Sequence, residues 1–220
     1  MPALHGRALT LGEEIANSIS HGLGFVGVMI AAPFVLRGAL HQGGAAALVG
    51  AIVFLASAAL LYITSTLYHA LPGGGRVAQV FQRLDHSAIY VFIAGTYTPF
   101  LLGPLRGGWG WALFGVIWAL AALGVVLKSV FGARQPLLST LLYVGMGWLV
   151  VIAARPLIQH VPFGGLMWLL AGGLAYTFGA VFFMFDHRIR YGHFVWHLFV
   201  LAGTACHFVA VFRYATGGVR

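Results

Sequence analysis

Two histidines stand four residues apart in His193-Phe194-Val195-Trp196-His197. Residues at this spacing share one face of a helix, with Cβ atoms about 5–6 Å apart, so both imidazoles could bind one metal ion. His69 follows Ser65 at the same spacing in another apolar segment. Neutral imidazoles suit zinc, and catalytic zinc sites commonly use three protein ligands and leave a fourth position for water. We therefore predict a Zn²⁺ site formed by His69, His193 and His197.

Two further residues could supply catalytic groups to this metal site. The histidine pair is not the His-Glu-x-x-His motif, because position 194 is Phe and brings no general base. Asp85 is the best replacement, since a carboxylate could hold and deprotonate a metal-bound water. Ser65 could donate a hydrogen bond to a substrate carbonyl oxygen as negative charge develops. Asp85 and Ser65 are therefore the candidate catalytic residues of a metal-dependent hydrolysis.

A simpler interpretation of these polar residues stays open. A lone histidine within a membrane can hydrogen-bond a neighbouring helix, and Asp85 beside Arg83 could be an interfacial charge. The same choice holds for a polar group near the N-terminus, which is either a polar helix start favoured by the helix dipole or part of the site. Its members are Glu13, Glu14, Asn17 and His21.

The remaining histidines have weaker claims to metal ligation. His207 lies deeper in the last apolar segment, where packing or hydrogen bonding is the expected role. His86 follows Asp85 but points about 100° away on a helix. It could therefore contact the residues that bind the metal, but it is not expected to bind the metal itself. The others are expected in loops or at their edges, in contact with water: His5, His41, His160 and His187.

The elements that must position these residues are membrane helices. Hydrophobic residues make up 60% of the 220-residue chain and charged residues only 7%, whereas soluble domains carry about 25% charged residues. So short a chain cannot bury that much apolar surface in one water-soluble core, so lipid must cover the rest. The net charge of +8 comes from basic residues scattered between apolar runs. We therefore expect membrane lipids and no nucleic acid as partners.

Apolar segments between the charged residues predict an all-α bundle of seven membrane-spanning helices in one domain, residues 1–220. A span needs about 20 mostly apolar residues. The expected spans are 17–37, 44–71, 86–103, 109–128, 136–155, 163–185 and 193–213. Thr10-Leu11-Gly12-Glu13 has the spacing of a capping box, so a helix is expected to begin there. Met1–Thr10 does not resemble a signal peptide, and the single cysteine, Cys206, excludes an intramolecular disulfide.

The number of spans decides whether the polar residues can meet. With seven spans, the end of the second, the start of the third and the start of the seventh all lie at one membrane face. The basic residues expected at that face number seven: Arg7, Arg76, Arg83, Lys128, Arg134, Arg188 and Arg190. Five are expected at the other: Arg37, Arg106, Arg155, Arg213 and Arg220. This bias favours a cytoplasmic N-terminus and an external C-terminus in a multi-pass protein of the cell membrane.

These motifs together resemble one family along nearly the whole chain. Residues 13–22, Glu-Glu-Ile-Ala-Asn-Ser-Ile-Ser-His-Gly, are similar to the opening motif of the hemolysin III proteins. Other segments resemble further signature positions of that family: Ser65-x-x-x-His69, Leu84-Asp85-His86-Ser87, Gly95-Thr96-Tyr97-Thr98-Pro99 and His193-x-x-x-His197. Hemolysin III proteins belong with the progestin and adipoQ receptors, and that wider group is related to alkaline ceramidases.

The resemblance implies a fold and a site. It implies seven helices with the N-terminus inside, and zinc held by His69, His193 and His197 on the cytoplasmic side. It also implies that Asp85 orients the zinc-bound water and that Ser65 lies beside it. The short N-terminus fits a bacterial member of the family and not a hormone receptor.

Two functions remain open. The favoured one is a zinc-dependent hydrolase of a lipid amide, because a site at the membrane interface suits a substrate with an acyl chain. The alternative is a non-enzymatic protein with structural zinc, acting in membrane homeostasis, sensing or cytolysis, although no span shows the continuous polar stripe of an aqueous pore. A retinal protein is not expected, since the only lysine is Lys128 near the end of a span. A haem held by both His193 and His197 is excluded because they share one helix face. The sequence gives no oligomeric state.

Overall fold

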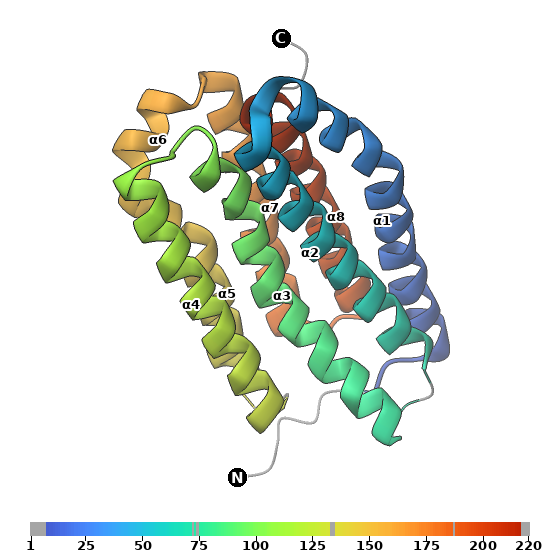
Figure 1. Ribbon diagram of the computed structural model, residues 1–220. Coiled ribbons are helices and arrows are strands. Elements are labelled where there is room, and N and C mark those ends of the chain that lie inside the picture. Colours follow the sequence, from blue (N-terminus) through green and yellow to red (C-terminus); the bar gives the residue numbers. More distant parts are fainter. Residues whose placement is uncertain (1–7, 72, 74, 133–134, 187, 217–220) are drawn as a thin grey trace.

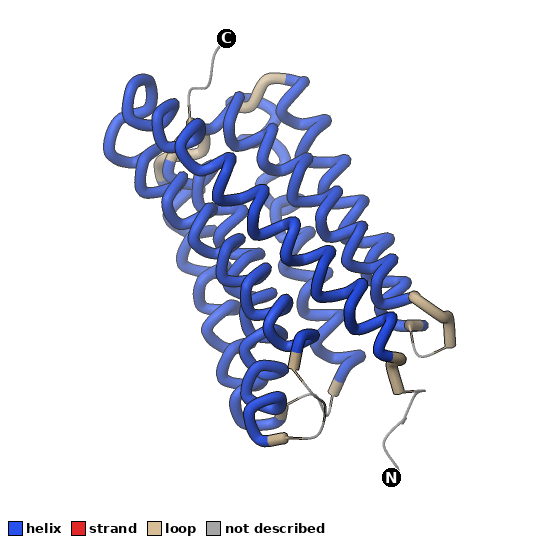
Figure 2. Tube along the Cα trace, turned by 90° about the vertical axis from the view of Figure 1, so that its right-hand side faces the viewer, coloured by secondary structure: helices blue, strands red, loops and turns tan. Residues whose placement is uncertain are grey.

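The computed structural model describes residues 8–71, 73, 75–132, 135–186 and 188–216. This part of the chain is all-helical and forms a bundle of seven long helices that run side by side (Figures 1 and 2). Six of them carry the labels α1 (Leu11–Gly38), α2 (Gly44–Ala70), α3 (Arg76–Leu102), α4 (Gly108–Phe131), α7 (Phe163–Phe185) and α8 (Gly192–Ala210). The remaining one is built from α5 (Pro136–Trp148), a 3₁₀ segment (Leu149–Ala153) and α6 (Ala154–His160). Short π-helical segments extend α1 (Ala39–Gly43) and α8 (Val211–Ala215). The all-α, seven-helix prediction is confirmed.

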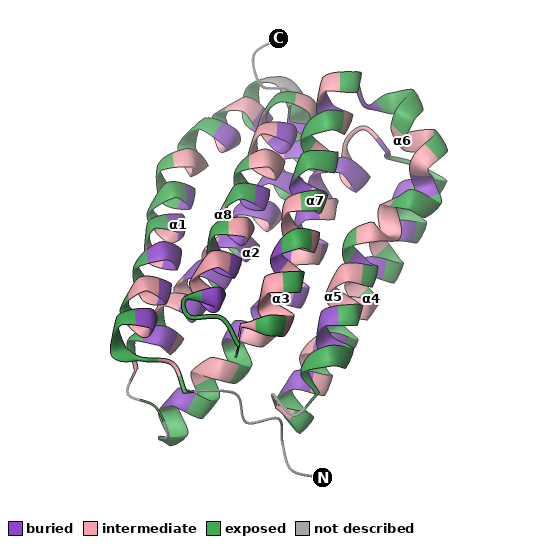
Figure 3. Cartoon of the chain, turned by 180° about the vertical axis from the view of Figure 1, so that it is seen from behind, coloured by how far each residue is buried: buried purple, intermediate pink, exposed green. Residues whose placement is uncertain are grey.

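The bundle has the surface of a membrane protein. Large apolar side chains are exposed on the outer faces of the helices, as with Ile19, Leu23 and Phe34 on α1. Buried residues instead line the inward faces (Figure 3). Six helices are long and apolar enough to cross a membrane, within the residues that the structure describes. The chain is therefore a multi-pass membrane protein.

The third helix, α3, is the exception: at 27 residues it is long enough to cross a membrane, but it is not apolar enough. It begins at Arg76, ten residues before the predicted span at 86–103, and its first turns carry Arg83 and Asp85. Its later part buries the hydroxyls of Thr96 and Thr98. Because α3 packs between α2 and α4, protein and not lipid surrounds these polar groups.

The start of α1 matches the capping signal in the sequence. Thr10 is the N-cap, and its side chain accepts a hydrogen bond from the Glu13 backbone N–H. The Glu13 carboxylate accepts in turn from the Thr10 backbone N–H at 2.9 Å. This confirms the predicted capping box and satisfies two donors that a helix start leaves free.

The segment Gly95–Pro99 of α3 contacts α2 and the junction between α5 and the 3₁₀ segment. A Cβ on Gly95 would lie 2.8 Å from Ser57 Cβ on α2, so only glycine permits this approach. The Tyr97 hydroxyl lies 2.7 Å from Gly147 O and accepts the Val150 N–H at 3.0 Å. These backbone groups stand where α5 passes into the 3₁₀ segment, and a buried polar side chain can satisfy such a break.

Candidate metal centre

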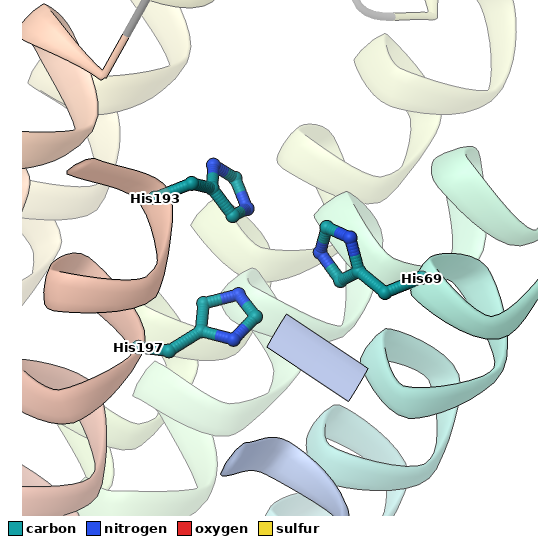
Figure 4. A group of neighbouring side chains, drawn as sticks. All are labelled: His69, His193 and His197. Atoms are coloured by element: carbon teal, nitrogen blue, oxygen red, sulfur yellow. The ribbon is translucent and has the colours of Figure 1, made fainter. Parts of the chain in front are cut away.

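Three histidines from two helices meet at one end of the bundle. His69 lies in the last turn of α2, and His193 and His197 lie in the first turns of α8. Their rings point toward one another (Figure 4), and one nitrogen of each lies within 4.8 Å of the others. All three side chains are buried. The sequence prediction that these residues come together is thus confirmed in its geometry.

The two nitrogens of each ring have different surroundings. His69 Nδ1 lies 2.6 Å from Glu14 Oε2, and His193 Nδ1 lies 2.7 Å from Asp186 Oδ2. His197 Nδ1 lies 3.2 Å from the Asn17 carbonyl oxygen. The Nε2 atoms of all three histidines are buried and have no hydrogen-bond partner among the described residues.

This pattern fits a metal ion. Carboxylate and carbonyl oxygens only accept hydrogen bonds, so each Nδ1 carries the hydrogen and each Nε2 presents a lone pair. Metal-bound histidines characteristically donate the second ring N–H to a carboxylate or a backbone carbonyl, which fixes the tautomer and ring orientation. Three buried acceptors without partners would otherwise be destabilising. His69, His193 and His197 are therefore the residues that could hold a cation.

The N-terminal part of α1 supports this centre from outside. Glu14 and Asn17 supply two of the three hydrogen-bond acceptors, and the Ser20 hydroxyl lies 3.0 Å from His197 Nδ1. The His21 ring stacks on His197, with centroids 3.5 Å apart and planes 8° from parallel. The polar group at positions 13–21 thus belongs to the site and is more than a polar helix start.

Glu13 joins the same end of α1 to the chain just before α8. Its Oε1 accepts the Tyr191 backbone N–H at 2.8 Å. Tyr191 is the N-cap of α8 and has a left-handed φ of 59°. Such a conformation is unfavourable for a residue with a bulky side chain, so the hydrogen bond to Glu13 helps to set where α8 and its two histidines begin.

The candidate catalytic residues lie beside the three histidines. Asp85 is buried and lies close enough to His69 for electrostatic interaction. The Ser65 hydroxyl is buried beside Asp85, to which it can donate a hydrogen bond. Neither residue belongs to the group of converging ligand atoms. Asp85 lines the cavity described next, whereas Ser65 does not.

A large apolar cavity begins at Asp85. Its empty space is about 950 Å³, counting the part that opens to the outside. Of this space, the centres of water-sized spheres can occupy about 120 Å³. Near the metal centre it is lined by His21, Asp85 and Trp196, and it extends between α3, α5, α7 and α8 as far as Gly173 and His207. His69, His193 and His197 do not line this cavity, which adjoins the centre through Asp85 and through His21, the ring stacked on His197.

The other histidines lie as the sequence suggested, where the structure describes them. The His207 Nε2 lies 3.3 Å from Leu169 O, which fits a packing and hydrogen-bonding role. His41 and His160 are exposed, and His86 is half-buried. His5 and His187 lie outside the described residues.

Sequence reasoning missed Asp186 and left Glu14 undecided. The contact between Glu14 and His69 joins positions 55 residues apart, so no local pattern could reveal it. Asp186 stands seven residues before His193, across the connection from α7 to α8. The available signal was chemical: the chain has only four acidic residues, and each of them lies at this end of the bundle.

Fold and site together define a class: a multi-pass helical membrane protein with a buried three-histidine centre at one end. The chain belongs to the haemolysin-III related family, which matches residues 9–208. This confirms the resemblance read from the motifs.

Relatives of known name cover most of the chain. Hemolysin-3 of Bacillus cereus is 45% identical over 202 residues, which cover 92% of this chain and 91% of that protein. A hemolysin-3 homolog of Bacillus subtilis (strain 168) is 43% identical over 205 residues, covering 93% and 95%. The monocyte to macrophage differentiation factor of Homo sapiens is 32% identical over 162 residues, covering 70% and 65%. The similarity thus extends from bacterial proteins to a human one.

Proposed function

We propose that this protein is a zinc-dependent hydrolase of a lipid amide, with its metal centre on the cytoplasmic side of the membrane. The observation that carries the proposal is the cavity, which is lined at one end by Asp85, the carboxylate near His69, and continues into the bundle between apolar side chains. A substrate with an acyl chain could place the chain there and its amide near Asp85. Zinc is the preferred ion because three neutral imidazoles suit it.

The residues of the chain have distinct tasks in this reaction. Zinc, when bound, supplies a Lewis acid that polarises a carbonyl group and makes water more acidic. Asp85 lines the cavity, where its carboxylate can accept a proton from the attacking water. The Ser65 hydroxyl lies beside Asp85, where it can donate a hydrogen bond to the carboxylate or to the carbonyl oxygen of the amide. The apolar walls hold the chain and exclude bulk water.

The cytoplasmic placement rests on charge. Of the described basic residues, five fall at the end of the bundle that carries the histidines (Arg76, Arg83, Lys128, Arg188 and Arg190) and four at the other (Arg37, Arg106, Arg155 and Arg213). Basic residues are enriched in cytoplasmic loops. Labelling of single cysteines placed at positions 73 and 107, which lie at opposite ends, would test it.

Fatty acid release from a defined N-acyl amide tests the hydrolase proposal. Purified wild-type protein in detergent is expected to release fatty acid, and Asp85→Asn is expected to lose at least about 100-fold of that rate, the lower range for removal of a general base. Thr140→Val is the matched control, because Thr140 lines the same cavity but its hydroxyl bonds within its own helix to Pro136 O. Metal content should be equal in all three proteins. Equal rates in wild type and Asp85→Asn would contradict the assignment.

A structural role for the metal is the second candidate. The histidines come from α2 and α8, and their hydrogen-bond partners Glu14 and Asn17 come from α1. A cation here would join three helices. If this were its only role, chelation would lower the melting temperature and no N-acyl amide would be cleaved.

A further inference from the structure

Most polar side chains on the cavity wall already make hydrogen bonds within the protein. The Tyr143 hydroxyl donates to His86 O at 2.9 Å, and Trp148 Nε1 donates to Thr177 Oγ1 at 2.9 Å. Hydroxyls with partners of this kind also include those of Thr96, Tyr97, Thr140, Tyr176 and Thr177. The hydrogens of these groups are therefore used within the protein, and a ligand finds no free donor among them.

His207 differs from them and lies far from the metal centre. Its ring lines the cavity, and Nε2 lies 3.3 Å from Leu169 O. Nδ1 is buried and has no partner among the residues that the structure describes. Because a carbonyl oxygen only accepts, Nε2 carries the hydrogen in the neutral ring, and Nδ1 offers a lone pair. Such an acceptor favours a ligand that brings a hydrogen-bond donor.

The fold holds this ring in place. A Cβ on Gly172 would collide with His207 Cδ2, so glycine at this position makes room for the imidazole. Tyr176 packs against the ring edge-on, with centroids 5.3 Å apart and planes at 73°. The Tyr176 hydroxyl is engaged with Thr204. The orientation of His207 is therefore set by its neighbours, which a recognition group requires.

Helix geometry gives the distance between the two polar ends of the cavity. His207 follows His197 by ten residues on α8, which corresponds to a rise of about 15 Å. Between these depths the wall carries apolar side chains, Ile89, Phe92 and Val200 among them, together with hydroxyls whose hydrogens are bonded within the protein. A matching ligand is polar at the metal end, apolar along its length, and carries a second polar group about 15 Å away.

We propose that His207 is a specificity residue that accepts a hydrogen bond from a hydroxyl on the substrate's acyl chain. The substrate class is then an amide of a hydroxylated fatty acid, with the hydroxyl about 15 Å from the carbonyl. This inference rests on the proposed hydrolase function, whose substrate it narrows.

Two N-acyl amides of equal chain length, one plain and one hydroxylated at this depth, provide the test. One neutral hydrogen bond corresponds to about a threefold to tenfold preference, so wild type should show this ratio in kcat/KM. His207→Leu should remove the preference, so that kcat/KM becomes equal for the two amides. His207→Gln retains an acceptor and should restore part of the preference. Val200→Ala, which alters the wall without touching a polar group, should leave the preference intact.

Measurements of amide binding distinguish failure of the His207 inference from failure of the hydrolase proposal. In Asp85→Asn protein, binding of each amide is followed by the fluorescence of Trp148 and Trp196, which line the cavity. Tighter binding of the hydroxylated amide, lost with His207→Leu, supports the role of His207 even if wild type cleaves neither amide and the hydrolase proposal fails. Equal binding of both amides, with or without His207, overturns this inference and leaves the hydrolase proposal standing if both are cleaved.

Discussion

The carboxylate of Glu14 accepts a hydrogen bond from Nδ1 of His69 at 2.6 Å, across 55 residues of the chain. Asp186 makes the equivalent contact with His193 at 2.7 Å. Each carboxylate fixes which nitrogen of its histidine faces the centre of the site. The fold of the chain thus orients these imidazoles through their hydrogen bonds, as is characteristic of metal-binding histidines.

Loss of either carboxylate should weaken zinc binding without removing a ligand. We expect Glu14→Ala and Asp186→Ala to lower zinc affinity by about 10–100-fold each, the usual effect of removing a hydrogen-bond partner of a metal-bound histidine. Competition with a chromophoric chelator measures the affinity. Ser18→Ala is the control, since Ser18 bonds the Thr66 carbonyl between the same two helices and contacts no histidine. Unchanged affinity in both carboxylate variants would contradict the assigned roles.

The hydroxyl of Ser65 should matter for turnover and not for metal. Ser65→Ala removes a buried hydroxyl beside Asp85, so the free energy of unfolding should change by no more than about 1.5 kcal/mol. If the hydroxyl stabilises charge that develops on the carbonyl oxygen, kcat should fall on the order of 100-fold. Rates of fatty acid release and zinc content are compared with wild type. A fall in zinc content equal to the fall in kcat would show that Ser65 supports the metal instead.

Much of this organisation was predictable because membrane insertion constrains it. Apolar length predicted the number of helices, and an odd number of spans placed Asp85 at the same end as His69 and His193. The start of α3 was not predictable from hydropathy, because its first turns are polar. The hydrogen-bond partners of the histidines were not predictable either. Glu14 reaches His69 only through the packing of α1, and Asp186 reaches His193 only through the turn before α8.

The close approach of α2 and α3 depends on Gly95. In Gly95→Ala the new Cβ would collide with the Ser57 side chain and lie 3.4 Å from Val53 O. We expect a loss of about 1–3 kcal/mol in the free energy of unfolding, as for other overpacked sites. Thermal melting in detergent measures it. Gly115→Ala on the exposed face of α4 meets nothing within 4 Å and should be neutral or stabilising; similar melting temperatures for the two variants would exclude a special role for Gly95.

Filling the cavity should select against long substrates. Gly173 lines the cavity, and a Cβ there meets nothing within 4 Å, so Gly173→Leu can place its side chain in the empty space. We expect cleavage of long-chain amides to fall at least about tenfold, a loss of about 1.4 kcal/mol, while short-chain amides are cleaved as before. Gly27→Leu, on an exposed face of α1 with open space around it, is the control. Equal losses for short and long chains would mean that the acyl chain binds elsewhere.

Metal analysis of the purified protein tests the central claim most directly. Wild type should contain about one zinc ion per chain, and His69→Ala and His193→Ala should each lose it. His160→Ala should retain it, because His160 is exposed and bonds only to Pro156 O within its own helix. Equal metal in all four proteins would contradict a centre built from His69, His193 and His197.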